Sequence, residues 1–102
     1  MSLHYRQGDL LFIQQDTRPV VHLMARPGTV IVAGEATGHA HRLTEGTILE
    51  APDGTLYLDL LSAAKVVHEE HAPITLDPGL WLVVRQREYS PEAHFRTRMV
   101  LD

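Results

Sequence analysis

The sequence contains no cysteine, which excludes a disulfide framework and metal sites built on thiolates. It also lacks a long apolar segment. The longest unbroken run, residues 80–84, is five residues long, against the roughly 20 that a membrane-spanning helix needs. The first residues show no apolar stretch of signal-peptide length. We therefore expect a cytoplasmic protein with no membrane contact, in which any metal is held by His, Asp, Glu or water.

Charge of a single sign is missing as well. The formal net charge is −4 with neutral histidines, and the basic residues between Lys65 and Arg98 are interleaved with acidic ones. Binding to a phosphate backbone needs a basic surface, so nucleic acid is not an expected partner. The chain has 102 residues, of which 44% are hydrophobic, and we expect a single domain over residues 1–102 with one modest core.

Short apolar runs separated by turn residues recur at the spacing typical of all-β sandwiches and barrels. We therefore predict an all-β fold, a small barrel or sandwich of short antiparallel strands. The predicted strands are residues 9–14, 20–24, 29–33, 39–43, 47–50, 55–61, 65–68, 74–76 and 80–87. The Ser-Pro-Glu sequence at 90–92 is typical of a helix start, which predicts a short helix or a loosely ordered tail over residues 91–102.

Two histidines, His39 and His41, lie one residue apart in a predicted strand and follow Gly38. Side chains at i and i+2 of a strand point to the same face, so both imidazoles can reach one ion at about 2.0–2.1 Å. Gly38 would permit a bend or bulge that re-aims the pair. The alternative is that the two histidines are simply the solvent-facing residues of an amphipathic strand.

A second pair, His68 and His71, flanks two glutamates. It is not the His-Glu-x-x-His motif of zinc proteases, because the second histidine comes one residue early. In a continuous strand His68 and His71 would lie on opposite faces. Joint ligation therefore requires the extended chain to end near Glu69 or Glu70. The alternative is a solvated, charged loop.

Glu45 lies four residues after His41, on the same face if the strand continues. It is a candidate ligand or a hydrogen-bond partner of an imidazole. The predicted metal ligands are then His39, His41, His68, His71 and Glu45. Nitrogen and oxygen ligands suit a divalent ion, and Zn, Fe, Mn and Ni are not distinguished by composition.

The residues Gly34, His39, His41 and Glu45 are similar to the first motif of the cupins, which places a His-x-His pair and a glutamate on barrel strands around a divalent metal. The Asp-Pro-Gly turn at 77–79 is similar to a turn in the second cupin motif. This resemblance implies a cupin-like barrel. The sequence departs from the cupins because no histidine follows that turn before residue 87, so a fourth ligand would have to precede it.

Nearly the whole chain resembles a group of small, uncharacterised bacterial and phage-associated proteins. The resemblance rests on RQGDLLFI (6–13), GEATGHAHRL (34–43) and HEEHAPITLDPGLWLVVRQREYSPEA (68–93). It implies no activity. It does indicate that the two histidine clusters are features of the group.

Two hypotheses follow. The first is a metal-binding β domain with an open coordination position for water or an unidentified substrate, which leaves open whether the protein is an enzyme. The second is a non-enzymatic phage or host accessory module whose histidines are surface residues. In either case we expect a homo-oligomer, most simply a homodimer. Short strands leave exposed edges, and Leu61, Val67 and the strand around Trp81 offer apolar surface.

Overall fold

The computed structural model describes residues 3–34 and 36–86, and this part of the chain is all-β, with ten strands and no helix. The strands are β1 (His4–Gln7), β2 (Leu10–Gln15), β3 (Met24–Arg26), β4 (Val30–Ala33), β5 (Ala40–Leu43), β6 (Thr47–Glu50), β7 (Leu56–Leu60), β8 (Ala64–Val67), β9 (Ile74–Leu76) and β10 (Gly79–Arg85). The described residues accordingly contain no helix with the length and apolar character to cross a membrane.

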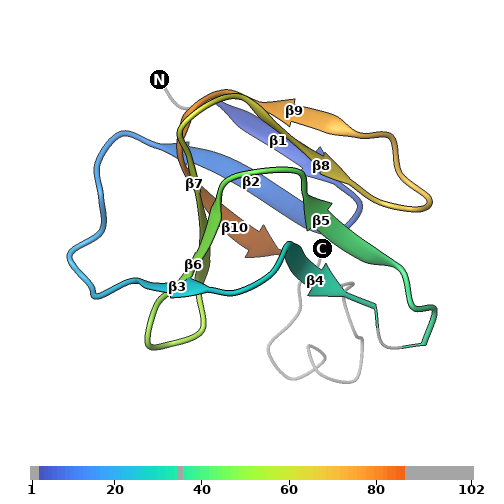
Figure 1. Cartoon of the computed structure of the whole chain (residues 1–102), viewed down its shortest axis with the longest axis horizontal. Helices are drawn as coiled ribbons and strands as arrows, with labels where there is room; N and C mark the ends of the chain where they lie inside the picture. Colours follow the sequence, from blue (N-terminus) through green and yellow to red (C-terminus); the bar gives the residue numbers. More distant parts are fainter. Residues whose placement is uncertain (1–2, 35, 87–102) are drawn as a thin grey trace, which may run out of the picture.

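The strands form two antiparallel sheets (Figure 1). The larger has the order β1-β2-β10-β7-β6-β3, and the smaller has the order β4-β5-β8-β9. In Figure 1, β9 runs beside β1, where the edges of the two sheets meet. Within the described residues the sheets do not close into a barrel. The fold is therefore a sandwich, which is one of the two architectures predicted from the sequence.

The hydrophobic core lies between the two sheets. Strand β7 shows the expected alternation: Leu58 and Leu60 are buried, whereas Leu61, just beyond the strand, is 95% exposed. The largest fully buried side chains come from both sheets and are Trp81, Phe12, Leu10, Ile31, Ile48, Leu58, Leu76 and Val66. Trp81 is therefore a core residue, and only its neighbours Leu80 and Leu82 leave part of their surface exposed.

The predicted strands agree with the structure from residue 29 onward, to within one or two residues at each end. Strand β1 is missed by the sequence analysis because its fully buried position is occupied by Gln7 instead of an apolar residue. The strand predicted at 20–24 is wrong. Val20 and Val21 are exposed there, and the strand begins only at Met24. The helix or tail predicted over 91–102 lies outside the described residues.

A β-bulge is present, but in β4 and not at Gly38. The pairing of β4 with β5 shifts register between Val30 and Val32. Gly38 has a φ of 77°, a left-handed conformation that favours glycine, and it lies in the turn that leads into β5. The register shift and the left-handed glycine both precede the first histidine pair in the chain.

Candidate metal centre

One pocket of the sandwich collects all four histidines of the two predicted pairs. It has a volume of about 210 Å³ and is formed by the β1–β2 turn, the end of β4, the start of β5, the β8–β9 loop and the end of β10. Its lining residues are Asp9, Val32, Gly34, Thr37, His39, His41, His68, Glu70, His71 and Arg85. The fold thus brings together side chains that are up to 76 positions apart in the sequence.

His39, just before β5, and His41, within it, both line the pocket, as the sequence analysis expects. The two differ in burial: the side chain of His41 is 7% exposed and that of His39 is 30% exposed. The turn before β5 holds His39, because its backbone N–H donates to Oγ1 of Thr37 and its carbonyl oxygen accepts from the N–H of Gly34. His41 is therefore the inner imidazole and His39 the outer one.

The second pair reaches the same pocket because β8 ends at Val67 and the chain bends over residues 69–71. This bend is the condition that joint ligation required. The ring centroids of His68 and His71 are 4.6 Å apart, and those of His41 and His68 are 4.4 Å apart. The structure therefore brings the two histidine pairs into contact.

These ring separations suit a shared ion. Two imidazoles bound to one tetrahedral ion at about 2.0–2.1 Å have ring centroids roughly 5 Å apart. The observed separations run from 4.4 Å for His41 and His68 to 6.1 Å for His41 and His71. The rings of His41 and His71 are nearly parallel, at 9°, so one of them must turn before both direct a nitrogen at the same ion.

The orientation of His41 is fixed by Gln7. The side-chain amide of Gln7 donates to the carbonyl oxygens of Val66 and Ala72, each at 2.9 Å. Its Oε1 atom therefore faces Nδ1 of His41, at 2.8 Å. Because this oxygen can only accept, Nδ1 of His41 must carry the proton. Neutral His41 then has its lone pair on Nε2, the nitrogen that a metal would bind.

The surroundings of His41 also keep it neutral. Burial is the main cause that lowers its pKa from 6.5, and the positive charges of His68, His71 and Arg85 act in the same direction. Asp9 opposes them and raises the pKa. The net effect is a lower pKa, so the unprotonated imidazole that ligation requires is favoured at neutral pH.

Asp9 is the main residue of the pocket that the sequence analysis missed. Its Oδ1 atom lies 3.7 Å from Nε2 of His41, and its Oδ2 atom accepts a hydrogen bond from Nε of Arg85 at 3.2 Å. A separation of 3.7 Å is too long for a hydrogen bond and is close to the roughly 3.3 Å between two ligand atoms of a tetrahedral ion. Two electron-rich atoms thus face each other.

The β1–β2 turn explains why Asp9 is so placed. Gln7, Gly8 and Asp9 are consecutive, and all three face the histidines. Gly8 has a φ of 61°, and a Cβ atom there would lie 2.7 Å from Nε2 of His71. A side chain at this position would therefore collide with the imidazole. The Gln-Gly-Asp sequence of this turn, with a polar residue at a buried strand position, was the feature of the sequence that could have identified Asp9.

Glu69 ties the β8–β9 loop to β5. One carboxylate oxygen accepts from the backbone N–H of Ala40 and the other accepts from Arg42, both at 2.9 Å. The bond from Ala40 is the largest cause that lowers the pKa of Glu69 to about 2, followed by the bond from Arg42. Glu69, His39 and His68 also place ligand atoms within 4.8 Å of one another. Because both oxygens of Glu69 already accept hydrogen bonds, the group around His41 is the stronger candidate for a metal site.

His68 is held in a state that does not bind metal. Its Nδ1 atom accepts a hydrogen bond from the backbone N–H of Glu70 at 3.0 Å, so the neutral ring carries its proton on Nε2. Ligation through either nitrogen requires this bond to break. His41 and Asp9 are therefore the groups already arranged for an ion, whereas His68 must reorganise.

Glu45 is not brought to this pocket. Strand β5 ends at Leu43, so the strand face that would have aligned Glu45 with His41 is interrupted. Glu45 instead accepts a hydrogen bond from Oγ of Ser62 at 2.7 Å, and it lines a separate cavity with Asp59. The structure places the other four predicted ligands together without it.

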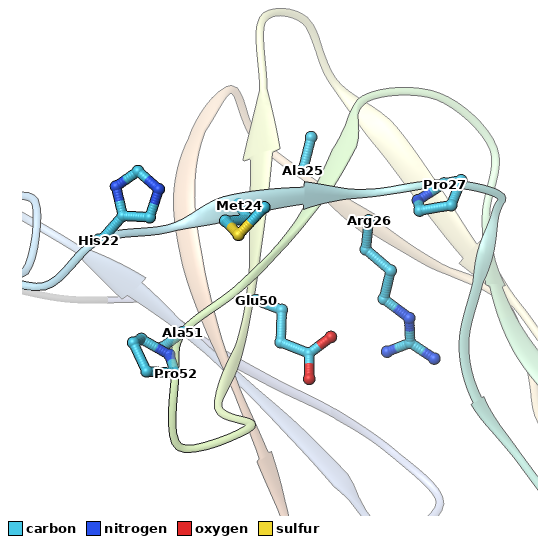
Figure 2. Close-up of a pocket in the computed structure, with 8 residues that line it drawn as sticks. All are labelled: His22, Met24, Ala25, Arg26, Pro27, Glu50, Ala51 and Pro52. Carbon is cyan, nitrogen blue, oxygen red and sulfur yellow. The ribbon is translucent and has the colours of Figure 1, made fainter.

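A larger groove, of about 380 Å³, runs along edge strand β3 (Figure 2). Its lining residues are His22, Met24, Ala25, Arg26, Pro27, Glu50, Ala51 and Pro52. Figure 2 shows Ala25 on the opposite side of β3 from the side chains of Arg26 and Glu50. The lining is mainly apolar and has one histidine, so this groove lacks the convergent donors of the histidine pocket.

Comparison with known proteins assigns the chain to a family but identifies no activity for it. No curated protein and no solved structure matches the chain significantly. One family model matches residues 6–86, a segment that contains Gln7 and every residue lining the histidine pocket. The expectation of an uncharacterised family is supported by this match. Because it spans most of the sequence, the chain belongs to the family described as a domain of unknown function (DUF8820).

Proposed function

We propose that this domain binds one divalent transition-metal ion in the histidine pocket. The observation that carries the proposal is the pair of facing acceptors, Nε2 of His41 and Oδ1 of Asp9, 3.7 Å apart. A cation between them would satisfy both atoms. A proton is disfavoured there because the pKa of His41 is lowered, and a metal ion is the remaining simple cation of the right charge and size.

Each of these two ligands has the partner that metal ligands usually have on their far side. Gln7 accepts from Nδ1 of His41, and Arg85 donates to the second oxygen of Asp9. Such outer bonds fix the orientation of a ligand and raise its affinity for the ion. The proposed remaining ligands are His39, His68 and His71, which line the same pocket.

The ligand set suits Zn, Fe, Mn or Ni, since it combines imidazole with a carboxylate. A set of His41, Asp9 and one of the other three histidines would leave coordination positions open for water or a small molecule. Such a site can act as a Lewis acid or lower the pKa of a bound water. We therefore propose a metal site of the open kind, with the reaction or ligand still to be identified.

The test is the metal content of untagged protein, followed by calorimetric titration of chelator-treated protein with Zn²⁺, Co²⁺, Ni²⁺, Mn²⁺ and Fe²⁺. We expect about one ion per chain. A free ion concentration a hundredfold above Kd should raise the free energy of unfolding by about 2.7 kcal/mol. The double variant His39→Ala/His41→Ala should lose both the ion and the stabilisation.

A matched control is the double variant His4→Ala/His22→Ala, since both of these histidines are exposed and lie outside the pocket. It should bind metal as the unmodified protein does. If the His39/His41 variant keeps full metal content and the same stabilisation, these histidines are surface residues and the proposal is wrong.

We propose an accessory interaction module, of phage or host origin, as the second candidate. Exposed apolar side chains favour it: Val20 and Leu61 are almost fully exposed and Met24 is 63% exposed. Isolated apolar residues on a surface are common, so the argument is weaker than the one for metal. Absence of metal after supplementation, together with self-association, would favour this candidate over the first.

A further inference from the structure

We infer that the metal site takes the carboxylate group of a small monoanionic ligand, and that Arg85 recognises this group. The inference rests on the proposed metal site and names the class of molecule at its open position. It depends on three features of the pocket: the unused hydrogen-bonding capacity of Arg85, the charge balance and the volume.

Arg85 uses only part of its guanidinium group. Its Nε–H donates to Asp9 at 3.2 Å, and within residues 3–34 and 36–86 its two terminal NH₂ groups donate to no other side chain or carbonyl. The side chain lines the pocket and is 38% exposed. A guanidinium offers paired donors that match the two oxygens of a carboxylate. Asp9 holds Arg85 beside the proposed metal site, and no residue of the described part of the chain occupies its terminal groups.

The charges of the filled pocket favour an anion with a single negative charge. A divalent ion and Arg85 would contribute three positive charges, and Asp9 and Glu70 contribute two negative ones. Neutral histidines add nothing. One positive charge is thus left uncompensated. A carboxylate would neutralise it, whereas a doubly charged oxyanion would exceed it.

The pocket is open to solvent, and its volume of about 210 Å³ limits the part of the ligand that lies beside the ion. This volume corresponds to roughly seven water molecules at about 30 Å³ each, part of which the ion itself would occupy. Val32 and Thr37 form the remaining wall, which gives one apolar contact and one hydroxyl group. The ligand is therefore a short-chain carboxylate, and acetate is the simplest probe.

The experiment uses the full chain loaded with Co²⁺, whose visible spectrum changes when a ligand enters its coordination sphere. Acetate, its neutral analogue acetamide and inorganic phosphate are titrated in turn. We expect saturable binding of acetate, weaker binding of phosphate and no binding of acetamide. Arg85→Gln should weaken acetate binding by tenfold or more, the size expected when a charge-assisted hydrogen bond is lost. Because Arg85 also hydrogen-bonds to Asp9, its replacement should lower Co²⁺ affinity as well, so acetate is titrated into protein that is already saturated with Co²⁺.

Two further variants make the result specific. Arg85→Lys keeps the charge without the paired donors and should retain part of the acetate affinity. Arg18→Gln removes an exposed arginine that pairs with Asp59 away from the pocket, and it should change nothing. Equal acetate affinity in Arg85→Gln and the unmodified protein would overturn the inference while leaving the metal site intact. Equal affinity for acetamide and acetate in the unmodified protein would overturn it too, because the site would then not select a carboxylate. If the unmodified protein binds no Co²⁺, the metal site itself fails.

Discussion

Nδ1 of His41 lies 2.8 Å from Oε1 of Gln7, and these two residues are the only buried polar ones in the described part of the chain. Buried polar groups are costly unless they are hydrogen-bonded. Gln7 meets this requirement fully, because its amide nitrogen also donates to Val66 and Ala72. One amide thus joins β1 of the larger sheet to the smaller sheet and sets the proton position of the innermost imidazole.

Replacing Gln7 with alanine should therefore reduce both stability and metal affinity. Three groups would lose their hydrogen-bond partner: the carbonyl oxygens of Val66 and Ala72 and the ring Nδ1–H of His41. We therefore expect a loss of about 2–4 kcal/mol in the free energy of unfolding. Metal affinity of the folded protein should fall about 10–100-fold, the usual effect of removing a partner of a metal-bound histidine. Urea unfolding and calorimetric titration measure the two effects.

Two comparisons separate the role of Gln7 from general destabilisation. Gln14→Ala removes an exposed amide with one long bond to Pro78 and should leave metal affinity unchanged. Gln7→Glu keeps an oxygen that accepts from Nδ1 of His41 and should keep metal affinity above that of Gln7→Ala. Nitrogen-15 shifts of His41 report the tautomer directly. A proton on Nε2 in the metal-free protein would show that this account of Gln7 is incorrect.

The lowered pKa of His41 predicts a specific dependence of stability on pH. Below pH 6.5 the unfolded chain takes up this proton more readily than the folded one. The contribution of His41 to stability is therefore fully present above pH 6.5 and is lost as the pH falls through the lower, folded-state pKa. In metal-free protein, the variant His41→Gln should show a smaller fall in the free energy of unfolding just below pH 6.5, measured by urea unfolding at successive pH values.

Glu69 provides the internal comparison for this measurement. Its pKa is lowered from 4.5 to about 2, so its contribution is present above pH 4.5 and is lost between about pH 4.5 and 2. Glu69→Gln should therefore alter the acid limb of the curve and leave the region near pH 6 unchanged. Identical curves for the unmodified protein and His41→Gln would contradict the assigned pKa shift.

Local patterns were enough to predict most of the fold. Alternating apolar residues such as Leu58 and Leu60, with turn glycines between the runs, identify strands because both signals act over a few neighbouring residues. The failures occur where residue type and burial disagree. Strand β1 has Gln7 at its buried position, and the apolar residues Val20 and Val21 are exposed. In both places burial is decided by contacts with distant strands and not by residue type.

The histidine cluster was predictable in part for the same reason. The i, i+2 rule aligns His39 and His41 without any tertiary information. The contact between Asp9 and Arg85 was not predictable, because it joins residues 76 positions apart. Glu45 was expected to extend the strand face of His41, but β5 ends at Leu43 before the chain reaches it. The spacing of the histidines in the sequence thus identified the imidazoles of the pocket. The residues that contact them are brought there by the sheet topology.

Substitution of the exposed apolar residues tests the expected homodimer. Leu61 is 95% exposed and Val20 is fully exposed, so a self-association surface that includes them would bury area now in contact with water. Light scattering at tens of micromolar should give twice the chain mass of 11.4 kDa. Leu61→Glu combined with Val20→Glu should shift the protein toward the monomer, whereas Leu3→Glu serves as a control elsewhere on the surface. A single-chain mass for the unmodified protein would exclude the dimer.

Gly8→Ala tests whether the β1–β2 turn shapes the metal site. The added Cβ would lie 2.7 Å from Nε2 of His71 and 3.3 Å from Cε1 of His41, at a φ of 61°. We expect about 1–2 kcal/mol of destabilisation from the left-handed backbone, and a further loss of metal affinity because His71 must move. Gly54→Ala has a φ of 92° and meets no atom within 4 Å, so it should show the backbone cost alone. If both variants bind metal as tightly as the unmodified protein, His71 is not part of the site, and the ligands must be sought among His39, His41, His68 and Asp9.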